Sequence, residues 1–543
     1  MGFFTDSQFD DTVPGTLVLV DIDHRLDVRH AKGNKSDVVL HPAPTDDPDD
    51  PLNWSRWRKL AQVICVNMYT FMISYASGVH YSIIGPISKS RGIPVSSIVS
   101  AQGYLFLLMG WGNLIWIPMA QKYGKRPMYL LSLITTLGIM LWLPHISSGP
   151  EWIASKILQG FVGAPVETLI EISIADVFFV HERAKHMGIY ASMVFIGSKV
   201  ASFLAGFIFD GQGWEWVPYW CVIFMGLSIV FCFFFLEESN YVRPAPQESV
   251  APTISTGLAE DPEAASKEVG VQISTTATST SSGESRAPKP FWSRLKLFRK
   301  PEKVSWQLMV LRPLKLFRFP IVCWSGFTYG SFLCLYTFFQ ATVSLVFSGE
   351  PYNFSAGSIG ITYLAPLVAG LVAMLYCGPF ESWAVLRIVR RRSGIWLAED
   401  RLWLLLICVV TSPGCCLLWG LGAAYEVHWF GLVFATFLLG FSISVGASLA
   451  ITYCIDSYKE IGSEAIVTVM LIRNTTNFAF SYGTSPWLSD MGYRNAYILA
   501  AVLFSLQALT TLPMIKFGPR LRKASQDKYQ YYIEQDKDHR ALH

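Results

Sequence analysis

Long apolar runs separated by short polar connections occupy most of the 543-residue chain. A helix that crosses a bilayer needs about 20 predominantly apolar residues, and hydropathy marks twelve runs of that kind. The predicted spans are residues 60–85, 96–119, 127–147, 151–178, 187–209, 214–236, 320–347, 358–380, 401–424, 428–455, 464–488 and 493–515. The sequence therefore predicts an all-α membrane protein with twelve transmembrane helices.

Three longer polar segments flank and divide these spans. They are expected to form a largely disordered cytosolic N-terminal segment (1–59), a central loop that is disordered in part (237–319) and a C-terminal tail (516–543). The bias of the central loop toward Ser, Thr, Glu and Pro is typical of disorder. Its basic stretch 294–318 leaves two interpretations, an amphipathic helix on the inner leaflet or a basic loop. Two six-helix bundles, 60–236 and 320–515, remain.

Lys and Arg gather at alternate connections between the predicted spans. Basic loops resist translocation, so these connections are expected to lie in the cytosol. They contain Arg56, Arg58, Lys59, Lys122, Lys125, Arg126, Arg183, Lys185, Arg387, Arg390, Arg391, Arg392, Lys516, Arg520, Arg522 and Lys523. Both termini are therefore predicted to be cytosolic.

Composition agrees with a lipid environment and argues against other classes of protein. Hydrophobic residues make up 52% of the chain, charged residues 15%, and the mean hydropathy is +0.36. A net charge of +3 is too small to indicate nucleic acid binding. The ten cysteines lie within apolar runs and form no CxxC pair, which favours packing over disulfides or metal sites. The chain has no GxSxG or GxxxxGK[ST] motif and no histidine cluster, so no enzyme, cofactor or metal is expected.

Two six-helix halves joined by a cytosolic loop resemble the plan of the major facilitator superfamily. The stretch WIPMAQKYGKRPMYL, residues 116–130, resembles the family's tight loop between spans two and three. Gly124, Lys125 and Arg126 match this loop, while Gln121 stands where the family usually has aspartate. The resemblance implies a conformational latch at this loop in which the usual salt bridge is weakened or is replaced by a neutral hydrogen bond.

The stretch from residue 155 to 190 resembles span four and the following loop of the drug:proton antiporter branch in its fungal form. Lys156 stands where that branch usually has arginine, and Glu167, Asp176 and Arg183 match. The resemblance assigns Lys156, Asp176 and Arg183 to conformational change.

The antiporter motif of span five appears as GSKVASFLAGF, residues 197–207. Gly197 and Gly206 fit the motif, whereas Ser202 replaces its proline, so the direction of transport stays open.

Residues 450–487 resemble spans ten and eleven of the same branch. Asp456 and Glu464 lie near predicted span ends, where they are either gate residues or solvated charges. Arg473, next to Asn474, falls well inside span eleven and needs a partner. That partner is either a structural counter-ion or a substrate or coupling group.

Glu167 and Glu171 lie one helical turn apart inside predicted span four. A charge near the bilayer centre costs roughly 2.5 to 3.5 kcal/mol, so both are expected to face protein or a watery cavity. Two neighbouring carboxylates there cannot both ionise cheaply, which suits one of them to carry a proton or to bind an organic cation. The alternative is a buried glutamate held by Lys156, Lys199 or the backbone for packing alone.

Polar and aromatic residues in other spans complete the predicted binding cavity, among them Asn67, Tyr336 and Gln340. The sequence thus predicts a proton-coupled transporter that works by alternating access, with a small organic solute, protons and the lipid bilayer as partners. Efflux of drug-like compounds or secondary metabolites is the first prediction, uptake of polyamines or other organic cations the second, and a non-transporting nutrient sensor the third. A monomer in the plasma membrane is expected, with the vacuolar membrane as the alternative.

Overall fold

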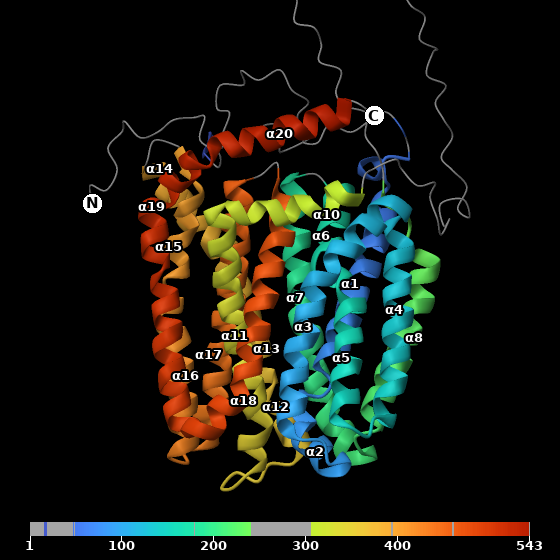
Figure 1. Cartoon of the computed structure of the whole chain (residues 1–543), viewed down its shortest axis with the longest axis vertical. Helices are drawn as coiled ribbons and strands as arrows, with labels where there is room; N and C mark the ends of the chain where they lie inside the picture. Colours follow the sequence, from blue (N-terminus) through green and yellow to red (C-terminus); the bar gives the residue numbers. More distant parts are fainter. Residues whose placement is uncertain are drawn as a thin grey trace, which may run out of the picture.

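The computed structural model describes residues 16–18, 47, 49–178, 180–240, 306–391, 395–458 and 461–541. Helices dominate these ranges and run roughly parallel to one long axis (Figure 1). The first half contains α1 (Arg56–Gly78), α2 (Ile84–Arg91), α3 (Val95–Tyr123), α4 (Lys125–Trp142), α5 (Gly149–Gly163), α6 (Pro165–Val177), α7 (Val180–Gln212) and α8 (Trp216–Phe235), with short 3-10 turns η2 (Pro51–Asn53), η3 (Tyr81–Ile83) and η4 (Leu143–His145).

The second half follows the central loop. Its elements are α10 (Trp306–Lys315), η5 (Leu316–Arg318), α11 (Pro320–Ser348), α12 (Ala356–Thr362), α13 (Leu364–Leu375), the π-helical turn η6 (Tyr376–Phe380), α14 (Glu381–Arg391), η7 (Ala398–Arg401), α15 (Leu402–Leu405), α16 (Cys408–Ala424), α17 (Trp429–Ser457), α18 (Gly462–Leu509), α19 (Thr511–Ala524) and α20 (Gln526–Ala541). In Figure 1, α20 crosses one end of the bundle near α10, and α2 and α12 lie toward the other end.

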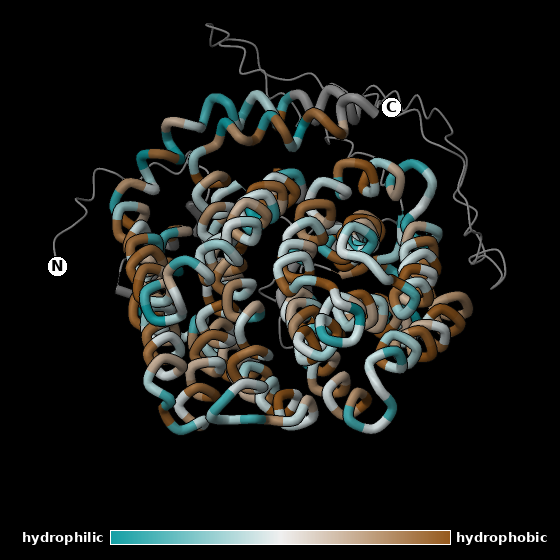
Figure 2. The backbone as a smooth tube through the Cα atoms, turned by 60° about the horizontal axis from the view of Figure 1, so that its bottom comes forward, coloured by the Kyte–Doolittle hydropathy of each residue, from teal (hydrophilic) through white to brown (hydrophobic). Residues whose placement is uncertain are grey.

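Twelve membrane crossings fit the structure. Among the described residues, eleven stretches are long and apolar enough to span a membrane, and the last runs for 61 residues from Glu464 to Ala524. Gly492 interrupts that stretch with φ 70°, a left-handed conformation that glycine adopts without strain. The stretch therefore comprises two spans. Figure 2 shows hydrophobic residues along the bundle helices and more hydrophilic residues along α20 and the connections.

Proline divides predicted span four. Pro165 lacks the N–H that would donate to the carbonyl of Phe161, so α5 ends at Gly163 and α6 begins at Pro165. The Trp116 indole Nε1 donates to that carbonyl at 2.8 Å instead. The break places Glu167 in the first turn of α6.

Several other boundaries differ from the predicted ones. Span eight was predicted to end at residue 380, but η6 and α14 continue the helix to Arg391. The tail predicted from residue 516 is helical in α19 and α20. The chain is also not purely helical, because strand β1 (Thr16–Val18) pairs antiparallel with β2 (Ile395–Leu397). Part of the N-terminal segment that we expected to be disordered is thus a strand.

The basic stretch 294–318 forms a helix where the structure describes it. Helix α10 packs against α3 and α18, and the Thr468 hydroxyl donates to the Pro313 carbonyl at 2.7 Å. The predicted disordered part of the central loop lies outside the described residues. All ten cysteines are free, as expected.

Candidate functional site

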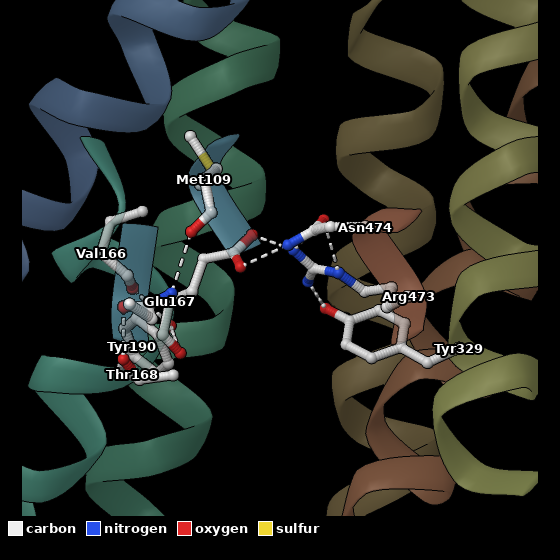
Figure 3. A network of polar contacts seen from close by, with 9 residues as sticks. Met109, Val166, Glu167, Thr168, Tyr190, Tyr329, Arg473 and Asn474 are labelled. Atoms are coloured by element: carbon white, nitrogen blue, oxygen red, sulfur yellow. Dashed lines mark hydrogen bonds and ion pairs between the residues drawn. The ribbon is translucent and has the colours of Figure 1, made fainter. Parts of the chain in front are cut away.

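The carboxylate of Glu167 lies between the two halves of the bundle, where α6 approaches α18 (Figure 3). Two contacts fix the first turn of α6. The Tyr190 hydroxyl donates to the Val166 carbonyl at 2.7 Å, and the Thr168 hydroxyl donates to Asn113 Oδ1 at 2.7 Å. The Glu167 side chain is only 7% exposed, so it needs a partner within the protein.

That partner comes from the second half. Arg473 Nη2 on α18 forms an ion pair with Glu167 Oε1, and Asn474 Nδ2 donates to Glu167 Oε2 at 2.8 Å. Both carboxylate oxygens of a first-half residue are therefore held by neighbouring residues of the second half (Figure 3). The alternative partners that we considered for Glu167, Lys156 and Lys199, do not pair with it.

Arg473 is held on its remaining sides by neutral groups. Its Nη1 donates to the Tyr329 hydroxyl at 2.8 Å, and its Cζ lies 4.6 Å from the centre of the Tyr329 ring. Its Nε and Nη2 also donate to Asn474 Oδ1 at 3.1 and 2.9 Å. The arginine thus has the counter-ion that its place inside span eleven required.

Glu171 is placed differently from Glu167, although both lie on α6. Its Oε2 is buried and makes no hydrogen bond within the described chain. Glu171 is close enough to Tyr190 and Tyr329 to interact electrostatically with both. Because Tyr329 also binds Arg473, the second carboxylate borders the same network without joining it.

The predicted cavity residues do not all gather at this network. Asn67 Nδ2 donates to the Val63 carbonyl within its own helix. Tyr336 lies with its hydroxyl 3.2 Å from Ser198 Oγ, and Gln340 Oε1 accepts from the Tyr363 hydroxyl at 2.8 Å. Tyr336 and Gln340 thus form a second group on α11, seven and eleven residues beyond Tyr329, the residue of this helix that binds Arg473.

Acidic residues hold the loop between α3 and α4. Lys125 Nζ forms an ion pair with Asp176, and the Glu238 carboxylate accepts from the backbone N–H groups of Lys125 and Arg126, each at 3.0 Å. Gln121 contributes its backbone carbonyl, which accepts from Asn240 Nδ2 at 2.8 Å. The ion pair between Lys125 and Asp176 thus forms at this loop without the Gln121 side chain. Gly124, with φ 111°, makes the turn.

The motif of α7 packs closely against other helices. A Cβ on Gly206 would lie 2.1 Å from the Ala356 carbonyl of the second half, and one on Gly197 would lie 2.6 Å from the Phe71 carbonyl. The Ser202 hydroxyl donates to the Gly78 carbonyl at 3.0 Å. The two glycines therefore permit close helix contacts. Ser202 adds a hydrogen bond that the family's proline, which has no hydroxyl, could not make.

Both acids predicted near the ends of spans ten and eleven are paired. Asp456 Oδ2 lies 2.8 Å from Arg401 Nε, and the same arginine lies 2.5 Å from Glu381 Oε1. Glu464 Oε1 lies 3.9 Å from Arg312 Nη1 of α10. The side chain of Arg183 lies outside the described residues.

Sequence reasoning missed a buried ion pair at the end of the second half. Arg522 binds both Glu399 oxygens, at 2.9 and 2.6 Å, and the Tyr453 hydroxyl donates to the same carboxylate at 3.3 Å. The charges of Glu399 and Arg522 next to spans nine and twelve were visible in the sequence. That they meet depends on how those spans pack.

Comparison with known proteins identifies the family. The family model described as Major Facilitator Superfamily matches residues 66–479. An uncharacterized MFS-type transporter of Schizosaccharomyces pombe is 27% identical over 96% of this chain and 94% of its own length. Protein HOL1 of Saccharomyces cerevisiae is 26% identical over 96% and 97%, and the MFS-type transporter penM of Penicillium rubens 26% over 90% and 91%.

A solved structure supports the fold. The crystal structure of the human organic anion transporter MFSD10 (TETRAN) matches with a TM-score of 0.51 and 14% identity, covering 84% of this chain and all of that one (100%). At this identity the match concerns the fold alone.

Proposed function

The chain belongs to the Major Facilitator Superfamily and is a multi-pass membrane transporter of small solutes, not an enzyme, and from this premise we propose that it exports a drug-like compound or secondary metabolite in exchange for protons. The observation that carries the proposal is the ion pair between Glu167 of the first half and Arg473 of the second. Alternating access requires the two halves to move relative to each other. A charged bond between them is therefore a bond that transport has to break.

The halves are in contact from this pair toward the end that carries α2 and α12. Hydrogen bonds join them there from Trp111 Nε1 to Thr475 Oγ1 at 3.0 Å, from the Gly357 N–H to Asp210 Oδ2 at 2.8 Å, and from Ser344 Oγ to the Ser82 carbonyl at 3.1 Å. The hydroxyls of Ser198 and Tyr336 form another, at 3.2 Å. The Glu167–Arg473 pair thus belongs to the set of contacts that keeps this end closed. Opening this end requires that the pair separate as well.

Protonation offers a way to release the pair. A neutral Glu167 loses its charge attraction to Arg473, which lowers the free energy needed to separate the halves. Arg473 keeps its hydrogen bonds to Tyr329 and Asn474, so it stays in place when the protonated Glu167 separates from it. Glu171, one turn further along α6, is the second carboxylate of the proposed coupling site.

Proton coupling can be tested without knowing the substrate. Purified protein is reconstituted into liposomes that enclose a pH-sensitive dye, a pH gradient is imposed, and a panel of drug-like compounds together with spermidine is added outside. We expect the parent protein to show solute-evoked proton movement. Glu167→Gln should reduce the solute-evoked proton movement at least about tenfold, while exchange of the same solute without a gradient continues.

The matched control is Glu215→Gln, which neutralises an exposed carboxylate paired with Arg91 at the loop before α8. This variant should couple like the parent. Full coupling in Glu167→Gln would overturn the role of the ion pair. The direction of solute movement relative to protons separates efflux from the uptake of organic cations that the sequence left open.

A further inference from the structure

Lys199 of α7 is buried inside a cage of aromatic rings, with 2% of its surface exposed. Its Nζ lies 4.3 Å from the ring centre of Tyr336, 5.4 Å from Phe195 and 5.5 Å from Tyr363. Within the part of the chain that the structure describes, no carboxylate forms an ion pair with it. Aromatic faces attract an ammonium group but do not neutralise its charge.

The two halves build this cage together. Lys199 and Phe195 belong to α7, whereas Tyr336 lies on α11 and Tyr363 between α12 and α13. The rings of the second half therefore leave the ammonium when the halves separate. In that conformation Lys199 would face the opened pathway with its charge uncompensated.

A second buried lysine lies in the same half. Lys156 of α5 is fully buried, and its Nζ donates to Gln159 Oε1 at 2.9 Å and lies 5.4 Å from the Trp152 ring. Both of its neighbours are neutral. Glu167 is already neutralised by Arg473, and among the described residues neither lysine has a carboxylate as an ion-pair partner.

A small pocket between the halves lies one aromatic ring away from each lysine, and neither lysine lines it. His80, Tyr81, Gln102, Thr337 and Gln340 are among the residues that line it. His80 lies against the Trp152 ring beside Lys156, and Tyr81 lies 6.0 Å from the Tyr336 ring that covers Lys199.

Polar atoms of this pocket lack partners. The Gln102 amide lies close to the His80 ring and to the Tyr81 hydroxyl, yet His80 Nδ1 and both polar atoms of the Gln102 side chain make no well-formed hydrogen bond with the described residues. Both side chains are at least 97% buried, since His80 is 2% and Gln102 3% exposed. Buried polar atoms without partners are uncommon in native proteins, and these two side chains can still bind a polar group of a solute.

We propose that this pocket and Lys199 form a subsite for a carboxylate of the transported solute, so that the substrate is an organic acid or a zwitterion. Lys199 and Lys156 supply the positive charge, and the amide of Gln102 supplies a hydrogen-bond donor. The proposal rests on the proposed transport function and narrows its substrate class. It weighs against a purely cationic substrate such as a polyamine, because two buried ammonium groups would repel it.

Matched probes test the charge preference directly. 4-Phenylbutyrate, 4-phenylbutanamide and 4-phenylbutylamine share a skeleton and differ in charge, as do 1-naphthaleneacetate, its amide and 2-(1-naphthyl)ethylamine. Their affinities are obtained from the thermal unfolding midpoint of the purified protein at fixed pH and salt, because a ligand that binds the native state stabilises it. We expect the carboxylates to bind about tenfold more tightly than the amides, and the amines most weakly.

Variants locate the preference. Lys199→Met and Lys156→Met should each reduce the carboxylate preference at least about fivefold, whereas Lys199→Arg should keep it, because the charge remains. The control is Lys122→Met in the last turn of α3, next to the Tyr123 ring, which should leave the preference unchanged.

Three results would overturn the proposal: equal binding of carboxylates and amides by the parent, tighter binding of the amines, or a preference that survives both methionine substitutions. Binding is measured without a proton gradient, so its outcome is separate from that of the coupling assay. A protein that prefers carboxylates but moves no protons would refute the proposed coupling alone. A coupled transporter of amines would refute only the carboxylate subsite.

Discussion

Replacing Glu167 by glutamine removes one charge from a buried pair and leaves the other. Removing one partner of a buried ion pair typically costs about 3 to 5 kcal/mol of unfolding free energy. Here both side chains are 7% exposed, so little solvent can reach the remaining charge. Arg473 keeps the Tyr329 hydroxyl and Asn474 Oδ1 as acceptors, which places the expected loss for Glu167→Gln near the lower end, about 3 kcal/mol.

Substituting the partner, Arg473, should lower the unfolding free energy more. Arg473→Gln leaves the Glu167 carboxylate with the amide of Asn474 as its hydrogen-bond donor, so we expect a loss of about 4 kcal/mol. The double variant carries no buried charge at the pair. Its loss should therefore be smaller than the sum of the two single losses, by roughly 2 kcal/mol or more.

The assay is a double-mutant cycle on unfolding free energies, measured by SDS titration of the purified protein in mixed micelles. Far-ultraviolet circular dichroism before titration shows that each variant is folded. The control is Glu171→Gln, which removes the carboxylate that has no hydrogen bond on Oε2 and should be neutral or stabilising. Additive single losses, with a coupling below about 0.5 kcal/mol, would refute the view that this pair stabilises the contact between the halves.

Two further predictions concern helix packing and a second ion pair. Gly160→Ala should destabilise the protein by more than about 2 kcal/mol, because the new Cβ would lie 2.1 Å from the Leu105 carbonyl. Gly226→Ala, with open space at its Cβ position, should stabilise it by up to about 1 kcal/mol. The two variants are compared by their thermal unfolding midpoints, and equal midpoints would contradict the close packing of α3 on α5. Arg522→Met should lower the unfolding free energy by about 3 to 5 kcal/mol, because it leaves the Glu399 carboxylate buried without its counter-ion. In the SDS titration, the double variant with Glu399→Gln should recover most of that loss. No recovery would mean that Arg522 acts through packing instead of charge.

The helices were predictable because lipid imposes a simple rule on sequence. Each crossing needs a long apolar run, so the positions of the spans follow from hydropathy. The breaks within spans were harder. Pro165 was visible, but whether a proline kinks or divides a helix depends on which group donates a hydrogen bond to the carbonyl that it frees. For Phe161 that donor is the Trp116 indole of another span. The pairing of β1 with β2 joins Thr16 to Leu397, which lies 381 positions further along the chain, and local sequence carries no signal for it.

The candidate site shows the same division between residue type and partner. The cost of burying charge singled out Glu167 and Arg473 as residues that need partners, whereas Lys156 was named by the family resemblance and Lys199 as a possible partner of Glu167. It could not pair them, because each span has many neighbours and only packing selects among them. In the structure, Glu167 and Arg473 neutralise each other across the halves, while both lysines contact only neutral groups among the residues that the structure describes. A charge that the protein itself leaves unmatched is the one that a solute can match, and for this reason the lysines, and not the ion pair, carry the inference about substrate chemistry.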